Sequence, residues 1–172
     1  MSLPRLTYLV IALGAGAWCA LLALPPLLAH LSGSPGGAAE LVASLFRPIC
    51  HQLEERSVML FGYPMAVCSR CSAIYVAFFA GTLLYPVIRK VDSPVMPPRW
   101  VLLVALVPIV LDVMAGILGV HAVTLTTRLW SGALFGVVAP FIIIPAAIEG
   151  IVQLVSRSHR TPVHQQKGLS DA

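Results

Sequence analysis

Residues 6–28, LTYLVIALGAGAWCALLALPPLL, decide the fold class of this chain because they contain no charged side chain. The hydrocarbon core of a bilayer is about 30 Å thick, and a helix needs about 20 apolar residues to cross it. The stretch is long enough, so it predicts a membrane-spanning helix. Pro25 and Pro26 predict a kink or a stop near its end, because proline lacks the amide donor that a helix uses.

The same stretch differs from a cleaved signal peptide, although Arg5 precedes it. A signal-peptide core has about 7–15 apolar residues and ends at a small-residue cleavage site. This run is longer and lacks a convincing site of that kind. We therefore expect it to be a retained first span.

The composition of the whole chain is that of an integral membrane protein. Of its 172 residues, 58% are apolar and 10% are charged, whereas soluble proteins have about 45–50% apolar and about 25% charged residues. The length suits a single membrane domain, residues 1–172. The net charge of +4 comes from short basic loops and a basic tail, which argues against nucleic acid as a partner.

Three further apolar stretches predict spans at 71–88, 100–120 and 130–155. Small residues at four-residue spacing in the second and fourth spans would let helices approach closely; they are Ala73, Ala77, Gly81, Gly132 and Gly136. Pro140 and Pro145 should bend the fourth span. We expect an all-α bundle of four transmembrane helices, with a mobile tail at 157–172.

The segment 40–71 lies between the first two spans and is expected to form a polar outer layer. Apolar residues recur at helical spacing over 40–57 and are opposed by charged residues. This pattern predicts an amphipathic helix, or two short ones with the second beginning near Pro48. Phe61-Gly62-Tyr63-Pro64 predicts a turn.

Lysine and arginine are unevenly divided between the two sides of this four-span arrangement. Seven lie on the side of the termini and four on the other side. The positive-inside rule then places both termini in the cytoplasm and the segment 40–71 outside. In a bacterium this corresponds to the inner membrane, with 40–71 facing the periplasm.

Three of the four cysteines lie beside a histidine in the outer segment. Three thiols and one imidazole are a tetrahedral ligand set for zinc, and C-x2-C is a common half-site. We therefore predict four metal ligands: Cys50, His51, Cys68 and Cys71. Adjacent residues of a helix point about 100° apart, so Cys50 and His51 share a metal only where the backbone is irregular, as Pro48 would allow.

Other uses of the same cysteines stay open. A C-x2-C at a helix start, with Arg70 beside it, favours thiolate and thiol–disulfide exchange. Four spans with an outer C-x2-C resemble in architecture the quinone-linked, disulfide-generating membrane enzymes related to vitamin K epoxide reductase, although Cys19 lies inside the first span instead of in the outer loop. An oxidising compartment could also join Cys50 to Cys68 or Cys71 as a structural disulfide.

Asp112 lies near the middle of the third span, where an ionisable side chain is costly and marks a functional site by default. Its candidate partners are Arg70 and Arg128, at the outer ends of the second and fourth spans. Two roles are therefore expected for Asp112: a structural ion pair, or a proton relay or substrate-binding site. With His121, these residues are expected to form a polar cluster beneath the cysteines.

The start of the fourth span carries three threonines before Arg128: Thr124, Thr126 and Thr127. Threonine caps helices, and the start of a helix also attracts anions. Capping and the binding of an anionic ligand are therefore both expected uses of this turn. If the metal keeps an open position, Asp112, Arg70 and Arg128 become candidate catalytic residues of a metal-dependent enzyme acting on a lipid or anionic substrate.

Part of the chain resembles the signature of a family of small bacterial and archaeal multi-pass membrane proteins of unknown function. The resemblance rests on Cys50-His51-Gln52, Arg56-Ser57, Gly62, Cys68-x-Arg70-Cys71 and Ile74-Tyr75. A second block of that signature resembles this chain at four later residues: Asp112, Thr126, Arg128 and Gly132. The resemblance implies a membrane location and a compact helical bundle, and it supplies no activity.

The favoured hypothesis is a zinc-binding membrane protein, either structural or a partner subunit of a larger complex or homo-oligomer. The alternatives are a thiol–disulfide oxidoreductase that uses Cys68 and Cys71 with quinone, and the metal-dependent enzyme described above.

Overall fold

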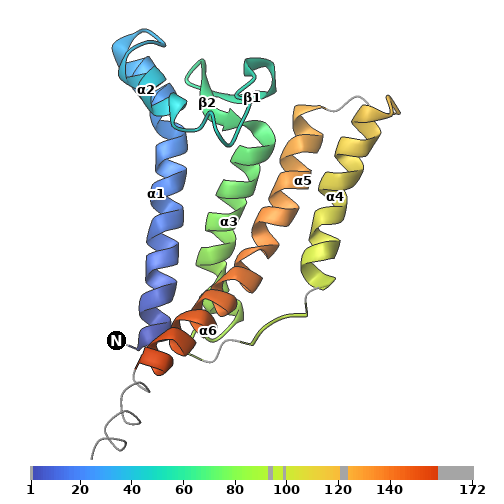
Figure 1. The fold of residues 1–172 in the computed structure, drawn as a ribbon. Coiled ribbons are helices and arrows are strands. Elements are labelled where there is room, and N and C mark those ends of the chain that lie inside the picture. Colours follow the sequence, from blue (N-terminus) through green and yellow to red (C-terminus); the bar gives the residue numbers. More distant parts are fainter. Residues whose placement is uncertain (1, 93–94, 99, 121–123, 159–172) are drawn as a thin grey trace, which may run out of the picture.

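The computed structural model describes residues 2–92, 95–98, 100–120 and 124–158. Within these residues, four helical segments are long and apolar enough to cross a membrane. They are α1 (Leu3–Ser32), α3 (Ser69–Ile88), α4 (Trp100–Ile117) and Leu125–Arg157, which consists of α5 (Leu125–Val138) and α6 (Pro140–Ser158). The predicted bundle of four transmembrane helices is confirmed (Figure 1). The expected mobile tail falls almost entirely outside the described residues.

α1 continues through its two prolines. A kink or a stop was expected there, and the expected stop is wrong. Pro25 and Pro26 lie inside the helix and are buried, and α1 continues to Ser32 before ending at Gly33, whose φ of 69° is left-handed. Because both prolines are buried, neighbouring segments cover this part of the helix. α1 therefore reaches beyond the bundle and supports the outer segment (Figure 1).

The closest helix contact in the bundle joins α3 to α5 through glycine. A Cβ atom added to Gly132 would lie 2.6 Å from the carbonyl oxygen of Arg70, and one added to Gly136 would collide with the carbonyl oxygen of Ile74. Gly81 meets Val137 in the same way, at 2.7 Å from its carbonyl oxygen. Small residues thus serve packing within the chain, one of the uses expected for this pattern.

The fourth span is bent where α5 gives way to α6. α5 ends at Val138 and α6 begins at Pro140, a buried proline that cannot continue the backbone hydrogen bonds of α5. The bend predicted at Pro140 is confirmed. It carries α6 across the end of the bundle where the amino terminus lies (Figure 1).

The segment between α1 and α3 forms a small outer layer at the end of the bundle away from the amino terminus (Figure 1). We call this end of the bundle the hairpin end. It consists of α2 (Ala38–Ser44), the single turn η1 (Glu54–Arg56) and the antiparallel strands β1 (Ser57–Leu60) and β2 (Tyr63–Cys68). The predicted amphipathic helix at 40–57 is confirmed only as the short α2, and the strands were not predicted. The predicted turn at 61–64 is confirmed at Phe61 and Gly62, where φ is 54° and 84°.

A compact apolar core fastens this outer layer to α1. Its buried members are Leu22, Phe46, Ala66 and Val67. Phe46 also meets Trp18 of α1 edge to face, with ring centroids 5.3 Å apart. Cys50, Cys71 and Tyr75 pack against the same core, so two of the clustered cysteines are held by it.

Candidate metal centre

Three cysteines converge at the junction of the outer layer and α3. The Sγ atoms of Cys50, Cys68 and Cys71 all lie within 4.8 Å of one another, and all three side chains are partly buried. Cys68 is the N-cap residue of α3 and Cys71 lies in its first turn. Cys50 is brought to them by a tight turn, in which its backbone amide donates to the carbonyl oxygen of Phe46 at 3.0 Å.

Gln52 locks the segment that carries Cys50 against the strand that carries Cys68. Its Nε2 atom donates to the carbonyl oxygens of Ala43, at 2.6 Å, and Ala66, at 2.7 Å. Its φ of 51° is unusual for a residue with a side chain. This bracing role was missed by sequence reasoning, since a long-range bond from an amide to two main-chain carbonyls leaves no periodic signal.

One sulfur of the cluster, that of Cys68, favours the thiolate form in the absence of metal. Hydrogen bonding by the Cys71 side chain, assisted by its backbone and by Cys50, lowers the pKa of Cys68 to about 5. The backbone amide of Cys68 in turn donates to the Cys50 sulfur at 3.2 Å. Metal ions bind thiolate and not thiol, so the Cys68 sulfur is in the form that a cation could bind.

The three sulfurs lie within 4.8 Å of one another, a range that one metal ion could bridge. A tetrahedral zinc with Zn–S bonds of about 2.3 Å holds its sulfurs about 3.8 Å apart, whereas a disulfide needs about 2.05 Å. All four cysteines are free in this structure.

His51 is not brought to the three sulfurs. Its side chain is exposed, and the group whose ligand atoms lie within 4.8 Å contains only cysteines among the described residues. Consecutive side chains point in different directions, and here Cys50 faces the apolar core while His51 faces outward. Cys19 also lies apart, in α1, with its Sγ 3.4 Å from the carbonyl oxygen of Tyr75.

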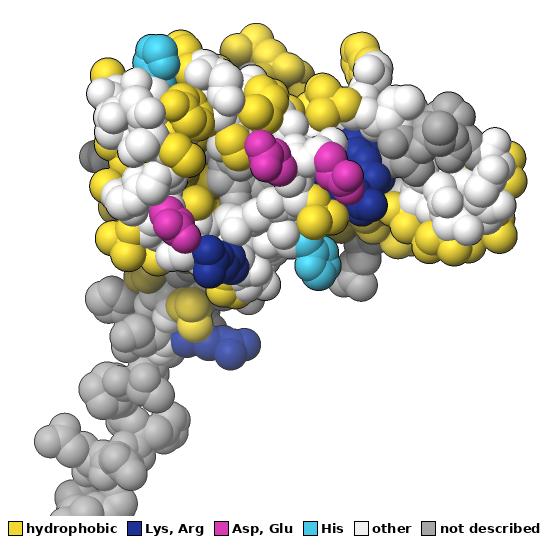
Figure 2. Space-filling view, turned by 90° about the horizontal axis from the view of Figure 1, so that it is seen from above, with side chains coloured by type: hydrophobic (Ala, Val, Ile, Leu, Met, Phe, Trp, Pro, Cys, Tyr) yellow, Lys and Arg dark blue, Asp and Glu magenta, His cyan; other side chains and the backbone are white. Residues whose placement is uncertain are grey.

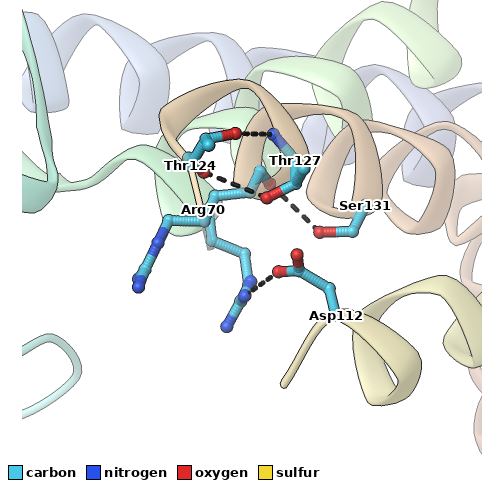
Figure 3. A network of polar contacts seen from close by, with 6 residues as sticks. Arg70, Asp112, Thr124, Thr127 and Ser131 are labelled. Carbon is cyan, nitrogen blue, oxygen red and sulfur yellow. Dashed lines mark hydrogen bonds and ion pairs between the residues drawn. The ribbon is translucent and has the colours of Figure 1, made fainter. Parts of the chain in front are cut away.

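A buried ion pair lies near the start of α3. Arg70, between Cys68 and Cys71 in sequence, donates to Asp112 of α4, and the two side chains are only 20% and 8% exposed. Asp112 thus meets one of its two predicted partners. The pair joins α4 to α3 across the outer part of the bundle (Figure 3). His121, the fourth expected member of this polar cluster, lies outside the described residues.

The start of α5 lies beside this ion pair. Thr124 is the N-cap residue, and its Oγ1 atom accepts a bond from the backbone amide of Thr127 at 3.3 Å, which confirms the predicted capping. Arg128 lies one turn into the helix and forms no ion pair with any residue in the described part of the chain. Arg128 therefore does not share Asp112 with Arg70.

Residues 50–142 match the family model described as "Predicted membrane protein (DUF2085)", and this match covers more than half of the chain. The chain belongs to the DUF2085 family. The matched region of this DUF2085 chain begins at Cys50 and contains the three clustered cysteines, the Arg70–Asp112 pair and Arg128. It leaves out α1.

One curated relative is the archaeal "Uncharacterized protein MJ1492" of Methanocaldococcus jannaschii. The two sequences are 35% identical over 108 residues, which is 63% of this DUF2085 chain and 69% of the relative. No solved structure matches the chain. The comparisons thus show a membrane protein family and name no activity.

Proposed function

We propose that Cys50, Cys68 and Cys71 bind one zinc ion and that the metal fastens the outer layer to α3. The observation that carries this proposal is the convergence of three thiols from two separate segments on one point. Thiolates select soft or borderline cations, and zinc with three or four protein ligands is the commonest such site. The protein would then be a metal-stabilised membrane protein, structural or a partner subunit of a larger complex.

The fourth zinc ligand in this proposal is a water molecule, or His51 after a local change of the backbone. Gln52 follows directly with a left-handed φ, so the backbone beside His51 is irregular, as a metal shared by Cys50 and His51 would require. A water ligand would give the metal an open position. A closed set of four protein ligands would favour a purely structural role.

Metal analysis of the purified full-length protein in detergent tests this proposal. About one zinc per chain is expected, and Cys68→Ser or Cys50→Ser should lose it. Cys19→Ser is the matched control, because Cys19 lies outside the cluster, and it should retain the metal. A metal-free protein whose intact mass is two hydrogens lower than that of the reduced chain would contradict the proposal, because it would carry a disulfide.

A second candidate function is thiol–disulfide exchange, and a cavity favours it. A half-open apolar cavity of about 470 Å³ between the helices is lined in part by Trp18, Ile74 and Tyr75. Tyr75 also packs against the core that Cys50 and Cys71 contact. Oxidation of two cluster thiols to a disulfide would release two electrons and two protons, which a quinone in this cavity would accept to become a quinol.

We further propose that both termini lie in the cytoplasm and that the hairpin end faces the outside of a bacterial inner membrane. The excess of lysine and arginine on the side of the termini supports this orientation. In the structure, the hairpin end and the amino terminus lie at opposite ends of the bundle (Figure 1).

A further inference from the structure

A small polar cavity lies at the hairpin end, apart from the three cysteines. It has a volume of about 240 Å³ and is lined by Glu55, Arg56, Leu125 and Arg128. The first two residues come from η1 and the last two from the first turn of α5. Two guanidinium groups from separate elements therefore face one space.

Positive charge exceeds negative charge around this cavity. Glu55 is engaged by Arg56, with Oε1 3.5 Å from Nε, and Asp112 is engaged by Arg70. Arg128 has no carboxylate within ion-pair distance among the described residues. Figure 2 looks onto this end of the molecule and shows acidic and basic side chains side by side on its surface.

Hydrogen-bond donors also gather near the start of α5. Positive charge from the helix dipole is concentrated at this first turn, where Thr124 caps the amide of Thr127. The Nε atom of Arg70 is buried and has no hydrogen-bond partner in the described part of the chain. Figure 3 shows the Arg70 side chain beneath the turn that Thr124 and Thr127 form.

We propose that this cavity binds a phosphate group, either of a lipid headgroup or of a free phosphate ion. Arginine recognises phosphate through two parallel hydrogen bonds, and a helix start supplies further donors. The volume is below the roughly 300–1,000 Å³ that is typical for drug-sized ligands, so it suits one small anionic group. Leu125 is 43% exposed and provides an apolar wall for the carbon atoms next to a lipid phosphate.

Two probes distinguish the sources of the phosphate, both applied to the full-length protein as purified in detergent. The first is inorganic phosphate, titrated against the midpoint of thermal unfolding at constant ionic strength. The second is phosphatidylglycerol, compared with a diacylglycerol of the same acyl chains by counting retained lipids in native mass spectrometry. Stabilisation by phosphate alone indicates a free oxyanion, and retention of phosphatidylglycerol alone indicates a lipid headgroup; either supports the proposal.

Three variants test whether the phosphate-containing probe binds in this cavity. Arg128→Gln should weaken the binding of the effective probe about tenfold, and Glu55→Gln should strengthen it, because a repelling carboxylate is removed. Arg47→Gln is the control, since Arg47 is an exposed arginine of the outer layer that pairs with Glu40 at 3.8 Å, and it should bind as the wild type does.

The proposal is overturned if neither probe acts on the wild type, or if Arg128→Gln binds as well as Arg47→Gln. Should Arg128→Gln fail to fold, Glu55→Gln decides, and an unchanged affinity in that variant overturns the proposal. The inference does not depend on the metal, because Arg128 and Glu55 are not among the proposed metal ligands.

Discussion

Cys68 is the residue whose sulfur carries the negative charge of the cluster in the absence of metal. It accepts hydrogen bonding from Cys71, and its own backbone amide donates to Cys50. A thiolate that is already formed at neutral pH lowers the proton cost of binding a cation. The three cysteines thus act as a unit, and replacing one changes the chemistry of the others.

Because Cys71 lowers the pKa of Cys68, the rate of Cys68 alkylation should depend on pH in metal-stripped, reduced protein. The pKa of Cys68 is lowered to about 5, so its alkylation should slow only as the pH falls through that value. Cys71→Ala removes the main hydrogen-bond donor, and the midpoint should move up toward the ordinary range near pH 8.5. Site-resolved mass spectrometry of iodoacetamide labelling measures this midpoint. Cys19→Ala is the control, and equal midpoints in Cys71→Ala and Cys19→Ala would contradict the account.

The Arg70–Asp112 pair links α3 to α4 near the hairpin end. Asp112→Asn leaves a buried guanidinium whose Nε already lacks a partner. The free energy of unfolding should fall by about 2–4 kcal/mol, measured by thermal unfolding in detergent. Adding Arg70→Gln should restore part of this loss, because the uncompensated charge is then removed.

The ion pair of Arg5 with Asp92 provides the matched control for this prediction. It lies at the other end of the bundle, and its side chains are 63% and 48% exposed. Asp92→Asn should leave the unfolding midpoint almost unchanged, because solvent screens exposed pairs. If Asp112→Asn is no more destabilising than Asp92→Asn, the Arg70–Asp112 pair does not stabilise the bundle.

Among the elements, α3 and α5 hold the bundle together by backbone proximity. Gly136→Ala would place a Cβ atom against the carbonyl oxygen of Ile74 and 2.9 Å from the Cβ of Ala77, and should cost about 1–3 kcal/mol of stability. Gly150→Ala is the control, since nothing lies within 4 Å of the added atom. Thermal unfolding of the two variants measures the difference, and similar midpoints would show that α3 and α5 are less closely packed.

The spans were predictable as elements, and the β-hairpin was not, for a physical reason. Long apolar runs identify membrane helices because the bilayer requires every backbone polar group to be bonded within the helix. The hairpin has strands of four and six residues, and its turn places Phe61 at a left-handed φ without an Asn-Gly or Asp-Gly pair. Its stability comes from packing of Ala66 and Val67 on α1, which no local pattern reveals.

At the scale of the whole molecule, the sequence predicted which cysteines cluster. It did not predict the contacts that bring Cys50 to the other two. Cys68 and Cys71 are local neighbours at a helix start, so their proximity follows from helix geometry. Cys50 joins them through a turn, the Gln52 bonds and the core around Phe46, all of which are tertiary features. The same turn leaves His51 exposed, which the sequence could not decide.

The proposed orientation makes a prediction for the molecule in its membrane. A thiol reagent that cannot cross the bilayer should label Cys68 of metal-stripped, reduced protein from the outside of intact cells. Lys90→Cys adds a thiol after α3, at the opposite end of that helix, and this thiol should react only after the membrane is opened. Labelling of Cys68 from the cytoplasmic side alone would reverse the orientation.

The central claim is that three cysteine thiolates bind one zinc ion at the hairpin end. X-ray absorption at the zinc edge of the purified protein tests it most directly, because the spectrum gives the number and distance of sulfur ligands. We predict three sulfur atoms at about 2.3 Å and one lighter atom at about 2.0–2.1 Å. A spectrum with fewer than three sulfur ligands, or protein that carries no zinc, would contradict the account.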